Sequence, residues 1–202
     1  MSNTQKLAFG ATLQEGIAIG TKNIGPILVN VFLWILTIWI PYLNVGTTIG
    51  LTTGIVAKAS KGEFIPMTEI FDPSYRKYMG EYFTTIGLMM MGIQVALLLF
   101  IIPGIVIGLA WSLAPLLVIE KGKNPTEALL LSNNCTYGYK WRMFGICFLA
   151  FVAFAILSSI LTAIFKNSFS LFMLSQLALY GFLFFVLIGL QASFYKQLTE
   201  DV

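Results

Sequence analysis

Histidine is absent from this sequence of 202 residues, and cysteine occurs only twice. Without histidine the chain has no Ser-His or Cys-His pair for nucleophilic catalysis and no histidine metal site. It also lacks a glycine-rich phosphate loop and a Cys-x-x-Cys pair, so neither nucleotide hydrolysis nor zinc is indicated. Carboxylates in the polar segments leave a carboxylate-based hydrolase open, although helix caps and solvated ion pairs explain them more simply. We therefore expect no cofactor, no metal and no enzymatic activity.

Charge is also scarce, at 10% of the residues, whereas soluble domains average about 25%. Hydrophobic residues make up 57% of the chain and the mean hydropathy is +0.84. A soluble fold of this size could not cover its surface with so few charges, whereas lipid tolerates this composition. The length predicts one integral membrane domain over residues 1–202. The first ten residues hold no long apolar segment, so no cleaved signal peptide is expected.

Six apolar stretches predict six membrane-spanning helices, because backbone inside lipid must satisfy its own hydrogen bonds. A span needs about 20 residues, and the second and fourth stretches are short. Local thinning of the bilayer, extension into the interface and re-entrant hairpins are the alternatives there. The expected fold class is all-α: a polytopic membrane protein with about six transmembrane helices arranged as three hairpins with short interfacial helices. The stretches are Ile24–Tyr42, Val45–Ala59, Tyr82–Ile102, Gly104–Ile119, Met143–Phe165 and Phe169–Phe194.

The polar segment between the fourth and fifth stretches carries the signals of a short helix. Asn124 can cap the helix, Pro125 suits its first turn, and Glu127 stands where a capping box needs an acidic residue. Gly138 is a plausible stop. We expect this helix to lie in the interface plane, with a solvated loop as the alternative.

Short similarities within the chain suggest a repeat of three units, each an interfacial helix followed by two spans. Lys61-Gly62 followed by 66–69 resembles Lys121-Gly122 followed by 125–127. The segment Ile19–Lys22 resembles Tyr137–Lys140 in the same way. Because the matches are short, chance similarity is the competing explanation.

Basic residues gather on one side of the expected membrane. With six spans, eleven of the twelve lysines and arginines and all nine acidic residues fall on the side of the termini. The opposite side carries only Lys166. The positive-inside rule therefore predicts that both termini are cytoplasmic.

The segment from Glu120 to Arg142 is the expected working surface. It combines the capped helix with basic residues and an aromatic anchor, which suit anionic headgroups or a docking protein. The alternative is that these residues only fix the topology. Membrane lipids, a protein partner or self-association are expected, and nucleic acid is not. The candidate partner-binding or lipid-binding residues are Lys121, Lys123, Lys140, Trp141 and Arg142.

Small residues recur at helical spacing inside the second and fourth stretches. They let helix backbones approach closely, either within one chain or between chains. The glycines assigned to helix packing are Gly46, Gly50, Gly54, Gly104 and Gly108. Four amides also lie in or near spans, where they either bond to a neighbouring helix or contact a transported molecule. These amides are Asn30, Gln94, Gln176 and Gln191.

Part of this sequence resembles a broad bacterial group of uncharacterised six-span integral membrane proteins. The resemblance lies in Ala114–Gly122, 125–128, Ser132 and Tyr137–Trp141. That group is similar to the membrane domain attached to some glycerophosphodiester phosphodiesterases. The matching pattern is Glu-Ala-Leu at 127–129, with Ser132, Thr136 and Gly138. The resemblance implies a membrane module of a bacterial cytoplasmic membrane without chemistry of its own. We expect a non-enzymatic module that anchors, assembles or regulates a partner at the cytoplasmic face, with a small transporter, channel or lipid-handling protein as the alternative.

Overall fold

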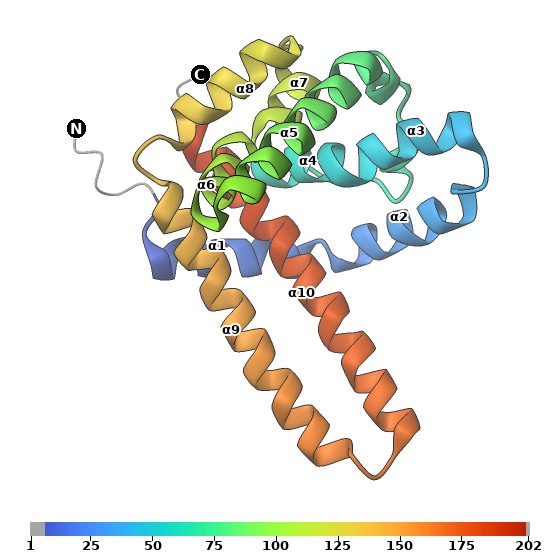
Figure 1. Cartoon of the computed structure of the whole chain (residues 1–202). Coiled ribbons are helices and arrows are strands. Elements are labelled where there is room, and N and C mark those ends of the chain that lie inside the picture. Colours follow the sequence, from blue (N-terminus) through green and yellow to red (C-terminus); the bar gives the residue numbers. More distant parts are fainter. Residues whose placement is uncertain (1–6, 201–202) are drawn as a thin grey trace.

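The computed structural model describes residues 7–200, and every regular element within that range is a helix. Figure 1 shows a head of shorter helices from which one long hairpin projects. The all-α fold class is therefore confirmed. In chain order the elements are α1 (Phe9–Lys22), α2 (Ile24–Thr37), α3 (Pro41–Ile49), the π-helical turn η1 (Gly50–Gly54), α4 (Ile55–Lys61), the 3₁₀ turns η2 (Glu69–Phe71) and η3 (Pro73–Arg76), α5 (Met79–Leu99), α6 (Ile101–Trp111), α7 (Ala114–Lys121), α8 (Pro125–Thr136), α9 (Lys140–Phe165) and α10 (Phe169–Leu198).

Four helical stretches of the described chain are long and apolar enough to cross a bilayer. A fifth is added if α1 and α2, which meet at a bend of 63°, form one span. These apolar helices indicate a multi-pass membrane protein. The prediction of six spans is therefore confirmed only in part, because the described chain contains four or five candidate spans. The four stretches are Met79–Leu99, Ile101–Lys121, Lys140–Phe165 and Phe169–Leu198.

The second expected span, Val45–Ala59, is not among these stretches. It folds as parts of α3 and α4 with the π-helical turn η1 between them. It holds four threonines and Lys58, and its apolar side chains Ile49, Ile55 and Val56 are buried inside the protein. Because those side chains pack against protein, they are not available to face lipid.

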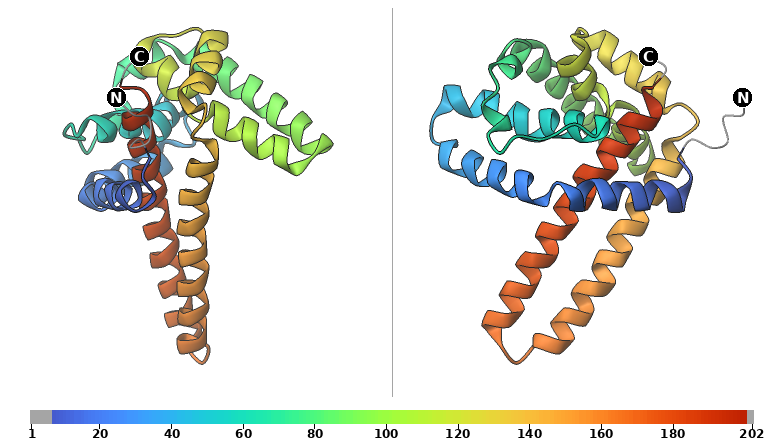
Figure 2. Two further views of the ribbon diagram at one scale, coloured as in Figure 1. Left: turned by 90° about the vertical axis from the view of Figure 1, so that its left-hand side faces the viewer. Right: turned by 180° about the vertical axis from the view of Figure 1, so that it is seen from behind.

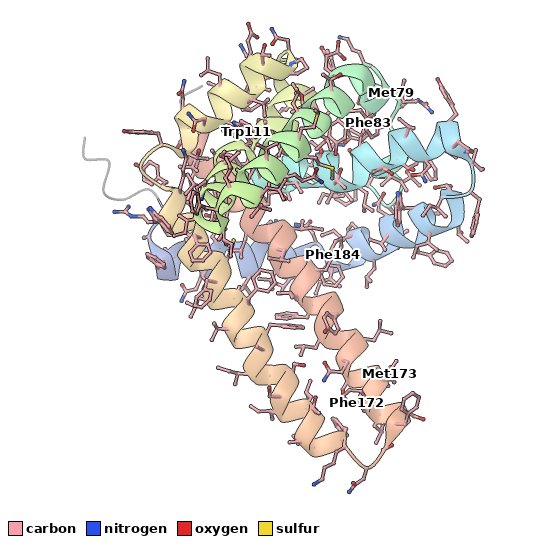
Figure 3. The ribbon with its side chains drawn as sticks, viewed as in Figure 1. Met79, Phe83, Trp111, Phe172, Met173 and Phe184 are labelled. Atoms are coloured by element: carbon pink, nitrogen blue, oxygen red, sulfur yellow. The ribbon has the colours of Figure 1, made fainter. Side chains whose placement is uncertain are left out.

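Three helical hairpins leave the head in different directions. Figure 2 shows α9–α10 as the longest, α5–α6 projecting to one side, and α2–α3 to another. Two of their tips are apolar and exposed: Trp39 is 87% exposed in the α2–α3 turn, and Leu98 is 86% exposed near the α5–α6 turn. The α9–α10 tip is polar, with Lys166, Asn167 and Ser168 between the helices. Figure 3 shows side chains standing free along most of α9 and α10. Such surfaces are stable only when lipid or another protein covers them.

The buried core lies where the second arms of the three hairpins meet. Ile55 of α4, Leu116 and Leu117 of α7, and Leu190 of α10 are each 1% exposed or less. Burial of each large apolar side chain stabilises the folded state by about 1.5–3 kcal/mol, so these residues supply much of the free energy that holds the arms together. The core therefore belongs to the head, and the hairpin tips contribute little to it.

The polar segments and hairpins alternate as the three-unit pattern predicts. The helix α1 precedes α2–α3, the turns η2–η3 precede α5–α6, and α8 precedes α9–α10. Each polar segment packs on the second arm of a different hairpin: α1 on α10, η2 on η1, and α8 on α6 and α7. Since α1 belongs to the first unit and α10 to the third, these contacts close a ring.

One of the two predicted internal matches holds in the structure. Gly62 and Gly122 both end helices in the left-handed conformation, with φ of +70° and +60°, so Lys61-Gly62 and Lys121-Gly122 are equivalent helix ends. The other match is wrong. Gly20 lies within helix α1, whereas Gly138 has φ of +82° in the turn after α8, so the local backbones differ.

Candidate functional site

The interfacial helix predicted from the sequence is α8, and its start has the expected cap. The Asn124 side-chain oxygen accepts a hydrogen bond from the backbone N–H of Glu127 at 2.9 Å. Pro125 occupies the first turn, where its missing N–H costs nothing. The helix, rather than a solvated loop, therefore forms this segment.

Ser132 fixes α8 to the break between α6 and α7. Its hydroxyl donates to the Ala110 carbonyl at 2.7 Å and accepts from the Leu113 N–H at 3.2 Å. Pro115 at the start of α7 prevents one continuous hydrogen-bonded helix there. Thr136 adds a hydrogen bond to the same carbonyl at 3.4 Å. The serine of the Glu-Ala-Leu pattern thus supplies partners that the broken helix lacks, and it holds α8 rigidly on the head.

The five candidate binding residues lie at the two ends of α8. Lys121 and Lys123 precede its start, and Lys140, Trp141 and Arg142 follow its end. The 12 residues of α8 separate the two groups by about 18 Å, so they do not form one cluster.

Lys140 and Arg142 make local contacts, and Trp141 is exposed. The Lys140 ammonium donates to the Asn133 side chain at 2.8 Å, and the Arg142 guanidinium lies 5.8 Å from the centre of the Tyr139 ring. Trp141 is 62% exposed, as an aromatic anchor at the headgroup level would be.

The outer face of α8 carries a shallow hollow of about 200 Å³. Lys123, Glu127, Leu130, Leu131 and Asn134 line it. Leu130 is 62% exposed although it stands on a helix rich in polar residues. The hollow therefore places an exposed leucine beside a lysine, a carboxylate and an amide, so it offers both apolar and polar contacts on one small surface.

A buried polar cluster that the sequence did not reveal joins η2 to α4. Glu69 is 3% exposed, accepts from the Lys58 ammonium at 2.7 Å, and accepts a short hydrogen bond from the Tyr75 hydroxyl. Burial and the contact with Glu69 raise the pKa of Tyr75. The sequence signal that could have found it was the position of Glu69 in the Pro-Met-Thr-Glu match to 125–127.

Glu15 makes the corresponding contact between α1 and α10. Its carboxylate accepts from Ser193 and Lys196 at 2.7 Å each and from Gln197 at 2.8 Å. In both places an acidic residue of a polar segment binds the second arm of another unit. These carboxylates therefore join the units of the ring.

A second ion pair ties the equivalent helix ends together. The Lys61 ammonium lies 2.8 Å from the Glu120 carboxylate, and this hydrogen bond raises the pKa of Lys61. Because Glu15, Glu69 and Glu120 each have a cationic partner, structural roles account for them. Residues 7–200 also hold no group of three acidic or cysteine residues placed to bind a metal ion.

Gly46, Gly50 and Gly54 face the η2–η3 segment and not a second long helix. A Cβ added at Gly50 would lie 2.8 Å from the Ile70 Cα, and one at Gly54 would overlap the Tyr75 ring. A Cβ at Gly46 would lie 3.0 Å from the Arg76 side chain. The glycine series therefore lets the short 3₁₀ turns η2 and η3 approach the backbone.

The two glycines of α6 differ from each other. A Cβ at Gly104 would overlap the Leu97 side chain of α5, so the hairpin arms meet closely there. At Gly108 the nearest atom would be the Ile93 Cδ1 at 3.9 Å, which is ordinary contact distance. The expectation of a tight contact is therefore wrong at Gly108 within the described chain, because a Cβ there would meet Ile93 at an ordinary contact distance.

Two of the four amides expected in or near spans form hydrogen bonds within the chain. Asn30 is fully buried, donates to the Pro26 and Pro66 carbonyls at 2.9 Å each, and accepts from the Ile70 N–H at 3.0 Å. Gln176 bonds to Ser158 on the facing arm of its hairpin. Asn30 therefore anchors the η2 segment and has no free group for a transported molecule.

Comparison of the chain with protein-family models, with curated proteins and with solved structures gives no match. The resemblance to the six-span bacterial group therefore stays a prediction from the motif at 127–138.

Proposed function

We propose that this protein is a non-catalytic module of a bacterial cytoplasmic membrane that holds a protein partner at the cytoplasmic face. Its hairpins α5–α6 and α9–α10, which hold the helices long and apolar enough to cross a bilayer, would enter the membrane from the head, which would place both termini in the cytoplasm. Supporting this orientation, the segments α1, η2–η3 and α8 all pack in the head, and the α5–α6 tip carries exposed apolar side chains such as Leu98.

The observation that carries the proposal is the hollow on α8. Ser132 and Thr136 attach the inner face of α8 to the head through hydrogen bonds to the Ala110 carbonyl, so the outer face has a fixed position. Among the residues that line the hollow, Leu130 supplies an exposed apolar contact, and Lys123 and Glu127 supply charges. A rigid patch loses little conformational entropy on binding.

The test is native co-purification of a variant in which Lys121 and Lys123 are both replaced by glutamine. We expect the partner to be lost or strongly depleted while membrane insertion is unchanged, because nine of the eleven cytoplasmic basic residues remain. A second variant, Leu130→Ser, removes the apolar contact without changing charge. The matched control replaces Lys22 and Lys77, two exposed lysines outside α8.

Each outcome decides between the alternatives. Anionic lipid should be lost in proportion to charge, at about 1 kcal/mol for each lysine near the surface, and Leu130→Ser should leave it unchanged. A protein partner should respond to both variants. Identical co-purification of proteins and lipids from the parent and all variants would refute the docking role and leave topology as the purpose of these lysines.

A lipid-handling role is the second candidate, favoured by an apolar cavity of about 120 Å³ between α1, α9 and α10. Leu13 and Ile17 of α1 close one end, and Ala153 and Leu183 are among the side chains on the walls. Because the lining is apolar, the cavity suits an acyl chain better than water. Replacing Ala153 by phenylalanine should fill it, and lipid-retention mass spectrometry should then show a loss of bound lipid if the cavity holds one.

A further inference from the structure

The helix α10 forms a wall shared by two cavities of the head. The first, of about 250 Å³, lies between α10 and the helices α6 and α9, and Leu109 and Cys147 are among its lining residues. The second, of about 280 Å³, lies between α10 and the η1–α4 segment. Leu187 and Gln191 of α10 line both cavities. Each volume is close to the lower limit of about 300 Å³ for pockets that bind small ligands, so there is room for a ligand group beside these two residues.

Within residues 7–200, the side chain of Gln191 has no hydrogen-bond partner on the walls of these cavities. It is half-buried, and no hydrogen bond from it to any described residue is found. The hydroxyls on the walls are bonded: Ser112 donates to the Leu109 carbonyl at 2.9 Å, and Thr52 donates to the Thr48 carbonyl at 2.7 Å. The Gln191 amide therefore offers two N–H donors and a carbonyl to the occupant of the cavities.

The position of Gln191 along α10 places it at a membrane boundary. The α9–α10 tip is polar at residues 166–168, and α10 is long and apolar enough to cross a bilayer. Gln191 lies about 33 Å from the start of the helix at Phe169, at about 1.5 Å for each residue from 169 to 191. The hydrocarbon core of a bilayer is about 30 Å thick. With the tip in the far headgroup layer, Gln191 therefore lies at the level of the ester groups in the leaflet nearest the head.

Apolar side chains continue from Gln191 toward the tip of the hairpin. Leu187 lies one turn away, and Phe184, the next along the same face, lines the second cavity and is 41% exposed. Figure 3 shows Phe184 on α10 where the hairpin leaves the head. Water could bond to the amide but would leave these apolar side chains uncovered. An acyl ester matches both features, because its carbonyl accepts hydrogen bonds and its chain enters the hydrocarbon.

We propose that Gln191 binds the ester carbonyl of a glycerolipid from the leaflet nearest the head, with the acyl chain lying along Leu187 and Phe184. Lipid is the solvent at this depth, and the acceptor oxygens of an ester match the two amide donors. The site is distinct from the cavity between α1, α9 and α10, whose residues Leu183 and Val186 lie on another face of α10. The inference rests on the membrane location of α9–α10 and not on the docking role of α8.

The test measures lipid retention by native mass spectrometry after the full-length protein is extracted from vesicles. The vesicles contain equal amounts of a diacyl phosphatidylcholine and of the dialkyl ether with the same chains, which lacks ester carbonyls. The parent protein should retain the diacyl lipid over the ether lipid by about 2- to 10-fold, the change that one hydrogen bond makes. Gln191→Met keeps the side-chain length and removes both donors, so the preference should be lost.

Gln176→Met is the matched control, because that amide is bonded within its own hairpin, and the preference for the diacyl lipid should survive. Leu187→Phe narrows both cavities and should lower retention of both lipids without changing their ratio. No preference in the parent protein, a preference that survives Gln191→Met, or its equal loss in both methionine variants would overturn the proposal. Retention of both lipids that Leu187→Phe leaves unchanged would also overturn it, because the lipid would then lie outside the cavities.

Discussion

Replacing Gly189 with alanine should force α1 away from α10. An added Cβ at Gly189 would overlap the Gly16 carbonyl and lie 2.8 Å from the Gly20 nitrogen, about 0.7 Å inside the ~3.5 Å optimum for contact. Both obstacles are backbone atoms, so no side-chain rotation can relieve them. We expect a loss of about 3 kcal/mol in the free energy of unfolding, the upper end for overpacking of a core.

This loss corresponds to a fall of roughly 6–12 °C in Tm for a protein of this length, measured by loss of the monodisperse peak after heating in mild detergent. Gly181→Ala is the matched control, because a Cβ there meets no atom within 4 Å on the same helix α10. Its Tm should be unchanged or slightly raised, since alanine favours helix over glycine. Equal Tm values for the two variants would show that α1 does not cross α10 this closely.

Gly50→Leu should destabilise the protein by about 1–3 kcal/mol through its contact with the η2 segment, whereas Gly108→Leu should cost little, and thermal unfolding of the two variants side by side would reveal any reversal of this order. Tyr75→Phe should cost about 1.5–3 kcal/mol in the free energy of unfolding, because it removes a hydrogen bond to a buried carboxylate; an unchanged Tm would contradict that contact. In intact cells, an impermeant thiol reagent should label a cysteine introduced at Asn167 and not one at Lys123, and labelling at Lys123 from outside would refute the orientation.

Local signals in the sequence found the elements that local chemistry determines. The cap at Asn124 and the helix that follows it depend only on neighbouring residues. The match of Lys61-Gly62 to Lys121-Gly122 is also local, and the structure shows both as glycine ends of helices. The long apolar stretches that form α9 and α10 are similarly evident from hydropathy. These features were therefore predictable without knowledge of the packing.

Long-range packing explains what the sequence did not show. Val45–Ala59 is apolar enough to suggest a span, but the same side chains serve equally well inside a core, and periodicity does not distinguish the two. The role of Glu69 depends on a lysine and a tyrosine that the fold brings to it. Of the residues that line the hollow, the sequence named Lys123 as a candidate binding residue but gave Glu127 only a capping role and Leu130 none, because exposure of one leucine on α8 is a property of the assembled head.

The contact of α1 with α10 joins two helices that lie far apart in the chain, and 178 positions separate the bonded residues Glu15 and Ser193. Until α10 has been synthesised and inserted, the glycine face of α1 at Gly16 and Gly20 has no helix to pack on. Closure of the ring must therefore wait for α10, through a pairing of very high sequence separation. A chain truncated before Gly189 would leave the glycine face of α1 without its helix, and we expect membrane proteases to degrade such an incompletely packed protein.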